Sequence, residues 1–174
     1  MTMRTIRVWD PLVRVFHWTL ALACLLNLTV LEDKPHEWVG YYALGAVLVR
    51  ILWGFIGTEH ARFSSFFPTP EKLKTYISHL LEGKPETSLG HNPLGALMIL
   101  ALIGVIILLG VSGYMTTLDA FWGEEWLEEI HEALGEFLMV LVTTHIAVVV
   151  LYSRYGKENL IKAMVTGNKI RDPG

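Results

Sequence analysis

The stretch HEALGEFLMVLVTTH, residues 131–145, places one histidine at each end of an apolar run. An α-helix rises about 1.5 Å and turns about 100° per residue, so these two imidazoles are predicted on nearly one face, about 21 Å apart. Ionisable side chains are costly inside a bilayer and usually mark a functional site. We therefore expect a membrane-spanning helix that carries two functional histidines at two depths.

Three further apolar stretches have the length that a helix needs to cross about 30 Å of hydrocarbon. The four predicted spans cover about residues 13–31, 38–56, 94–117 and 134–152. The 174 residues are 52 % hydrophobic and only 18 % charged, which is too apolar for a soluble domain. The first span has no clear small-residue cleavage site after it, so we expect it to be retained. The sequence predicts an all-α integral membrane four-helix bundle, one domain over residues 1–174.

Charge and cysteine content exclude several classes of protein. The net charge is −3 and no basic stripe runs along the chain, so we expect no binding of nucleic acid. Cys24 is the single cysteine, which excludes an internal disulfide, and the sequence contains no CxxCH for covalent attachment of a c-type haem. Any cofactor is therefore expected to bind through residues other than cysteine.

The basic residues divide unequally between the two sides of the predicted membrane. Lys34 is alone on one side, whereas the other side carries Arg4, Arg7, Arg14, Arg62, Lys72, Lys74, Lys84, Arg154, Lys157, Lys162, Lys169 and Arg171. Positively charged loops stay in the cytoplasm, so both termini are predicted to be cytoplasmic.

The outer joints are acidic, and one acidic group lies directly around His131: Asp119, Glu124, Glu125, Glu128, Glu129 and Glu132. Such a patch attracts a positively charged protein. A solvated loop that only follows the charge asymmetry of the membrane is the alternative interpretation.

The long inner joint, about residues 57–93, contains one amphipathic stretch. Between about residues 71 and 81 the apolar side chains share one helical face, which predicts an interfacial helix in contact with membrane lipid. A solvated helix that packs on the ends of the bundle would show the same pattern.

Four histidines lie in or at the ends of the spans, and they form two predicted pairs. His36 is level with His131 near the outer surface, and His17 is level with His145 near the inner surface. Two imidazoles from different helices suit the two axial positions of an iron porphyrin. Zinc or copper would require further ligands at the same depth. We therefore expect two non-covalent b-type haems, although any one histidine alone could be an ordinary hydrogen-bonding residue.

Glycines near the outer pair provide room for a flat macrocycle. Gly40 follows His36 by four residues and Gly135 follows His131 by four, so each lies one turn deeper on the same face as its histidine. Three more glycines in the third span suit either haem contact or close helix packing, namely Gly104, Gly110 and Gly113.

Arg50 is an ionisable residue inside the second span, 14 residues after His36. It is predicted to lie at the depth of the inner haem and to neutralise a haem propionate, with snorkelling to the cytoplasmic interface as the alternative. His60 and His79 are predicted at the inner surface, and His91 as a loop or capping residue.

Seven segments resemble a known family in their order and spacing: RVFHWTLA (14–21), HEWVGYYALGAVLVRILWGFIG (36–57), ARFSSF (61–66), GHNPLGALM (90–98), HEALGEF (131–137), THIAVV (144–149) and ENLIKAMVTGNK (158–169). The chain resembles the bacterial di-haem membrane cytochromes b of the b-561 type and the related b-type cytochrome subunits of nickel-iron hydrogenases.

The resemblance implies the same pairing of histidines, in an inner-membrane protein of a respiratory chain that exchanges electrons between quinone and a periplasmic partner. That partner would be a c-type cytochrome or another redox subunit. Two other functions stay open at this point: an enzyme that oxidises superoxide and reduces quinone, and a membrane anchor without redox activity. The acidic outer joints would repel superoxide, which is an anion, and therefore disfavour the first of these two functions.

Overall fold

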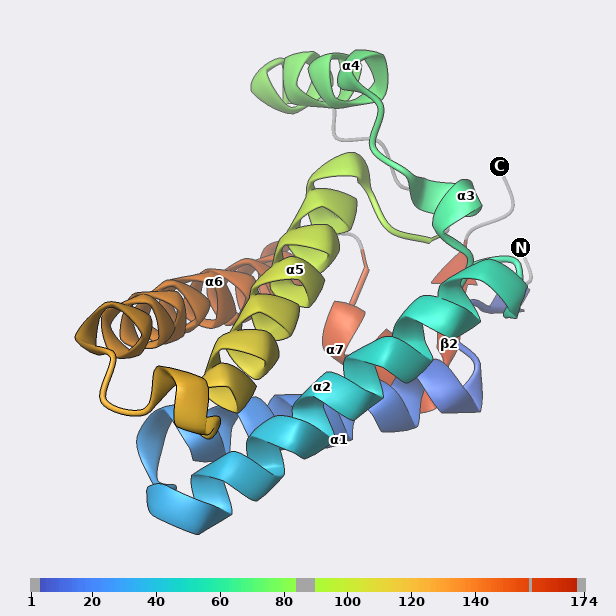
Figure 1. Ribbon diagram of the computed structural model, residues 1–174. Coiled ribbons are helices and arrows are strands. Elements are labelled where there is room, and N and C mark those ends of the chain that lie inside the picture. The colour runs from blue at the N-terminus through green and yellow to red at the C-terminus, as the bar shows by residue number, and fades with distance from the viewer. Residues whose placement is uncertain (1–3, 84–89, 157, 172–174) are drawn as a thin grey trace.

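Four long helices dominate the computed structural model, which describes residues 4–83, 90–156 and 158–171 (Figure 1). They are α1 (Pro11–Thr29), α2 (Asp33–Ile56), α5 (Pro93–Thr116) and α6 (Glu125–Tyr155). Each is long and apolar enough to cross a membrane. The prediction of an all-α membrane bundle is confirmed. Lys84 and Lys157, which were counted in the charge asymmetry, lie outside the described residues.

Two of these helices begin with the same kind of cap. Asp10 accepts a hydrogen bond from the backbone N–H of Val13 before α1, and Asn92 accepts one from Gly95 before α5. A proline follows each cap, where its missing N–H costs no helical hydrogen bond. Both starts lie at the same end of the bundle, the end that the charges predict to be the inner one, and the polar caps mark where these apolar helices begin.

The other two long helices begin earlier than their apolar stretches. α2 starts at Asp33 rather than near residue 38, and α6 at Glu125 rather than near 134. Helical hydrogen bonding continues into polar turns that have no apolar signal, and acidic residues are favourable in the first turn of a helix. Most of the acidic group around His131 therefore lies on helix α6.

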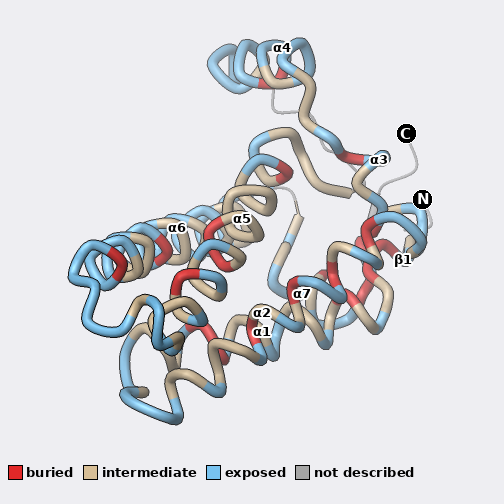
Figure 2. The backbone as a smooth tube through the Cα atoms, viewed as in Figure 1, coloured by how far each residue is buried: buried red, intermediate tan, exposed pale blue. Residues whose placement is uncertain are grey.

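The helices pack around a core that runs through the middle of the bundle. Its buried side chains come from all four long helices: Cys24, Ala43, Val47, Val105, Ile106 and Leu138. Figure 2 shows buried segments where helices face one another and exposed segments on the outward faces. Leu52 and Val140 on those faces are 65 % and 59 % exposed, as expected where hydrocarbon is the solvent.

A second core closes the inner end of the bundle and was not predicted. Strand β1 (Arg4–Arg7) pairs antiparallel with strand β2 (Asn168–Arg171), and the short helix α7 (Leu160–Thr166) precedes β2. The side chains buried there are Val8, Trp9, Val13, Ala61 and Ala163. The two ends of the described chain are thus joined beside the starts of α1 and α5.

The inner joint folds into two helices, α3 (Phe63–Phe66) and α4 (Pro70–Leu81). α4 covers the predicted amphipathic stretch and projects away from the four long helices (Figure 1). Leu81 at its end is 83 % exposed. Contact of this helix with lipid stays a prediction. On the opposite side of the bundle, a short 3-10 helix, η1 (Asp119–Phe121), leads from α5 into α6.

Candidate functional site: two facing histidine pairs

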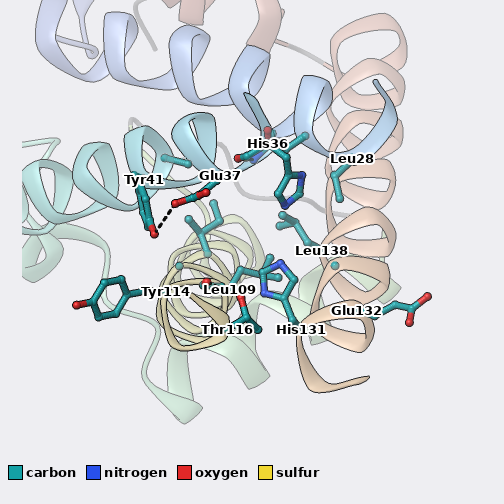
Figure 3. Close-up of a pocket in the computed structure, with 18 of the residues that line it drawn as sticks. Leu28, His36, Glu37, Tyr41, Leu109, Tyr114, Thr116, His131, Glu132 and Leu138 are labelled. Carbon is teal, nitrogen blue, oxygen red and sulfur yellow. Dashed lines mark hydrogen bonds between the residues drawn. The ribbon is translucent and has the colours of Figure 1, made fainter. Parts of the chain in front are cut away.

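The four histidines of the spans form two facing pairs. The ring centres of His36 on α2 and His131 on α6 are 6.1 Å apart, and Figure 3 shows the two rings pointing toward one another. The ring centres of His17 on α1 and His145 on α6 are 6.3 Å apart. The structure therefore brings together the residues that the depth argument paired.

These distances fit two axial ligands of one metal. A metal–imidazole nitrogen bond is about 2.0–2.1 Å long and the ring centre lies about 1 Å beyond that nitrogen, so opposite imidazoles on one metal have ring centres about 6 Å apart. Rotation about the metal bond leaves this distance unchanged, so ring planes inclined by 75° and 56° are compatible with it. A porphyrin supplies the other four nitrogens.

Within the described ranges no group of three or more His, Cys, Asp or Glu side chains is placed to hold a metal ion. Each pair thus offers two ligands and no more, which matches the donor set that a haem iron requires from protein. A bare zinc or copper ion would lack ligands at both places.

A cavity of about 840 Å³ surrounds the outer pair (Figure 3). This volume is in the range of pockets that bury cofactors. Gly40 and Gly135 line the cavity, and an added Cβ at Gly135 would meet nothing within 4 Å. The open space beside these glycines is consistent with the close approach of a flat ring to the helices.

Gly113 on α5 makes room for the ring of His131. A Cβ at this position would lie 3.0 Å from Cε1 of His131, so a larger residue would displace the imidazole. Gly110 serves ordinary packing, because a Cβ there would lie 3.0 Å from the side chain of Leu44. A Cβ at Gly104 would meet nothing within 4 Å. The glycines of the third span thus have different roles.

Ser112 is a residue beside the outer pair that the sequence did not indicate. Its side chain is buried, and its Oγ lies 2.9 Å from Nδ1 of His131. The same hydroxyl donates its proton to the carbonyl of Leu109 at 3.2 Å. In the tautomer of His131 that carries its proton on Nδ1, Oγ accepts from that N–H and Nε2 has a free lone pair for a metal.

Asn27 on α1 is a second polar residue of the outer cavity. Its Nδ2 donates to the backbone carbonyl of His36 at 3.1 Å, which ties the start of α2 to α1. Its Oδ1 is enclosed and has no hydrogen-bond partner in the described part of the chain. The periodicity of the sequence gives no sign that this asparagine, rather than another one, belongs to the site.

The rim and wall of the outer cavity are acidic. Its lining contains five carboxylates and one cation, namely Asp33, Glu37, Glu128, Glu132, Glu136 and Lys34. Lys34 is itself paired with Glu37 at 2.7 Å. A group bound in this cavity therefore experiences a negative field.

Arg50 is buried at the inner end of α2 and is only 3 % exposed. Its Nη2 donates to the carbonyl of Ala61 at 3.0 Å, and its guanidinium lies 5.1 Å from the ring centre of Phe63. Nη1 is enclosed and has no partner among the described residues. The guanidinium does not reach the surface, so the snorkelling alternative does not describe this side chain.

His91 also lies at the inner end, in the loop before α5. Its ring centre is 4.5 Å from that of Trp9 and 4.7 Å from that of Phe66. Burial and the nearby cations of Arg50 and Lys169 lower the pKa of His91 to about 3, so the imidazole is neutral at physiological pH. The sequence predicted a loop or capping residue, but the cap is Asn92, and His91 lies between the two aromatic rings.

Two carboxylates at the same end of the bundle as Arg50 and His91 already have partners. Glu158 pairs with the buried Lys169 at 2.7 Å. Asp10 accepts hydrogen bonds from Val13, Trp53 and Thr58. Burial acts to raise the pKa of Asp10, but these hydrogen bonds outweigh it and lower the pKa. The hydrogen bonds of Asp10 and the ion pair of Glu158 are thus made with groups other than Arg50.

A comparison with known families gives one match that covers most of the chain. The family described as prokaryotic cytochrome b561 matches residues 8–167. Similar proteins from Azotobacter vinelandii and Bradyrhizobium diazoefficiens are both 24 % identical, over 92 % and 95 % of this chain and 86 % of their own length. A third, from Rhodobacter capsulatus, is 23 % identical over 95 % of this chain and 81 % of its own. Each is named a probable Ni/Fe-hydrogenase B-type cytochrome subunit, and no solved structure matches the chain.

Proposed function

Because the chain belongs to the prokaryotic cytochrome b561 family, it transfers electrons in a membrane by means of b-type haem, and we propose that it carries two such haems. One haem would be held by His17 and His145 and the other by His36 and His131. The observation that carries this proposal is the pair of ring distances, 6.3 Å and 6.1 Å, each of which suits two axial ligands.

The haem iron supplies one-electron chemistry, while the chain's own residues set its conditions. Each haem would be held by two imidazoles, which would leave no position for a substrate and would favour electron transfer over chemistry at the metal. Ser112 orients His131, and the apolar helices keep water from the centres. His131 and His145 lie on one helix, which supports a route for electrons along α6 from one surface to the other.

The proposed orientation follows the charges at the two ends of the bundle. Arg14, Arg62 and Arg154 lie at one end, and Glu125 and Glu128 at the other. By the positive-inside rule the ends of the chain are cytoplasmic and the cavity around His36 and His131 faces the periplasm of a bacterial inner membrane.

The proposed periplasmic partner is a redox protein with a basic docking surface. The relatives' printed names associate them with Ni/Fe-hydrogenase, so a redox subunit of such an enzyme is one candidate, and a c-type cytochrome is another. The acidic residues above the outer pair are exposed in this structure, namely Asp119, Glu124, Glu125, Glu128, Glu129 and Glu132. Their negative field supports attraction of a basic protein.

Quinone is the proposed partner within the bilayer. A carrier dissolved in lipid can approach the haems along the exposed apolar faces of the helices, whereas a water-soluble protein reaches only the ends of the bundle. Electrons would thus pass between a protein outside the membrane and quinone within it.

The decisive experiment is a reduced-minus-oxidised spectrum of the purified protein with haem measured per chain. We expect b-type bands and two haems, and extraction with acidified acetone should remove both because no covalent bond holds them. One haem per chain would contradict the two-site proposal. A protein without haem absorbance would indicate a membrane anchor.

A further inference from the structure

Three enclosed nitrogen atoms near the inner histidine pair have no hydrogen-bond partner among the described residues: Nε of Arg14, Nη1 of Arg50 and Nδ1 of His91, which is a donor in the tautomer that carries its proton there. The same is true of Nδ1 of His17 and Oδ1 of Asn27. Native proteins rarely leave enclosed polar atoms without a partner, because each one costs free energy. Three donors close to one proposed haem therefore indicate a missing acceptor.

The three donors come from three separate segments, and Gly167 and Trp9 link the segment of Arg14 to that of His91. Arg14 lies three residues before His17 on α1, hence on the same face and about 4.5 Å nearer the inner surface. Its guanidinium donates to the backbone carbonyl of Val165. Arg50 and the imidazoles of His17 and His145 lie near enough to His91 to act on its charge.

Gly167, between α7 and β2, allows the wall to close. Its φ of 85° is a conformation that residues with a side chain rarely adopt. A Cβ at this position would lie 2.8 Å from the carbonyl oxygen of Trp9 and 3.5 Å from Nη1 of Arg14. The carbonyl of Gly167 also accepts hydrogen bonds from the N–H groups of Val8 and Trp9. The turn thus fixes Arg14 on one side and Trp9, which contacts His91, on the other.

The acceptor should be a pair of anions. The Arg50 guanidinium lies buried here and Nε of Arg14 is enclosed, while the carboxylates of Asp10 and Glu158 already bind other donors. Uncompensated buried cations are strongly unfavourable, and charge-assisted hydrogen bonds to carboxylates relieve that cost. A quinone offers only neutral carbonyl oxygens, whereas a b-type haem has two carboxylates on one edge.

We propose that Arg14 and His91 complete, with Arg50, a carboxylate-binding site that holds the two propionates of the inner haem. The two guanidiniums balance the two carboxylates, and His91 adds one N–H donor from a ring fixed between Trp9 and Phe66. This inference rests on the proposed function, because it requires a haem on His17 and His145.

The test uses the variant His131→Ala, which should keep only the inner haem. In this background, resonance Raman spectra report the propionate bending bands, which shift with hydrogen bonding to the carboxylates. We expect His91→Phe and Arg14→Gln to shift these bands and to speed release of the haem about tenfold to a hundredfold, the effect of losing one charge-assisted hydrogen bond. Phenylalanine preserves the packing between the two aromatic rings, and glutamine keeps a donor for Val165.

The matched control is His60→Phe, another histidine of the inner joint, which should leave the bands and the release rate unchanged. If the single haem is present and His91→Phe and Arg14→Gln alter neither readout, the carboxylate site is overturned while the two-haem proposal stands. An effect on the KM for quinone with unshifted propionate bands would also overturn it. If the background variant holds no haem or two haems, the pairing of the histidines itself is wrong.

Discussion

Ser112 on α5 and His131 on α6 are joined by a contact of 2.9 Å between Oγ and Nδ1, and this contact crosses from the helix without histidines to a helix with two. The hydroxyl donates a hydrogen bond to the carbonyl of Leu109, and in this orientation its oxygen accepts from Nδ1–H of the imidazole. The third span therefore contributes to the outer site by selecting the tautomer and the orientation of a proposed ligand.

Ser112→Ala should weaken binding of the outer haem about tenfold to a hundredfold, which is the usual effect of losing an outer-shell hydrogen bond to a metal ligand. Haem titration and the midpoint potential of the outer haem measure the effect. Thr29→Val is the matched control, since its exposed hydroxyl donates to the carbonyl of Leu25 on α1 and is not part of the cavity lining. Equal behaviour of the two variants would remove Ser112 from the site.

His36→Ala and His131→Ala should each lose one haem and keep the inner one, because each removes one of two axial ligands from the same iron. Haem per chain and the b-type bands at low temperature give the count. His60→Ala serves as the control and should keep both haems. Two normal haems in both outer variants would refute the pairing.

Arg50→Leu should lower the midpoint potential of the inner haem more than that of the outer, because a nearby positive charge stabilises the reduced iron. The expected shift is on the order of tens of millivolts for one charge at an intermediate dielectric constant. Redox titration followed in the visible spectrum resolves the two centres. The control Arg62→Leu removes an exposed arginine from the inner joint and should change neither midpoint potential. If Arg50→Leu shifted both midpoint potentials equally, Arg50 would have no local role at the inner haem.

The outer haem should have the lower midpoint potential of the two. Five carboxylates and one paired lysine line its cavity, whereas Arg14 and Arg50 lie beside the inner pair. Glu136→Gln removes one cavity carboxylate and should raise the outer potential, again by tens of millivolts. The inner potential is the internal reference in the same titration. An outer haem of higher potential would show that solvent screens these charges.

Electron exchange with a basic periplasmic protein should slow as ionic strength rises, by about tenfold or more, because salt screens attraction over about 8 Å at physiological strength. Neutralising Glu124, Glu125, Glu128 and Glu129 to glutamine should flatten this dependence in stopped-flow measurements. The control neutralises Glu59, Glu71 and Glu82 at the inner end and should leave it intact. If the rate of electron exchange changed neither with salt nor with the four substitutions, the acidic surface would not be the docking site of the partner.

Features with a regular period along one helix were predictable from the sequence. A spacing of 14 residues fixes both the depth and the face of His131 and His145, and the apolar runs locate the spans. The starts of α2 and α6 were predicted too late, because their first turns are polar and hydropathy marks the membrane rather than the helix. Only the hydrogen-bonded backbone shows that Glu125 already belongs to α6.

Features that depend on contacts between distant segments were not predictable. Ser112 meets His131 across two helices, and nothing in the spacing of α5 distinguishes this serine. His91 has an ordinary loop sequence around it, and its surroundings come from Trp9 and Phe66. The pairing of β1 with β2 likewise joins residues that share no local pattern.

That strand pairing constrains the order in which the molecule is completed during synthesis. Arg7 is opposite Asn168, so the first strand has no partner until the ribosome has translated 161 further residues. The outer cavity needs only α1, α2, α5 and the start of α6, whereas the wall beside Arg14 waits for Gly167 as well. The outer site can therefore assemble while the chain is still being inserted into the membrane, and the inner site becomes the last part of the protein to mature.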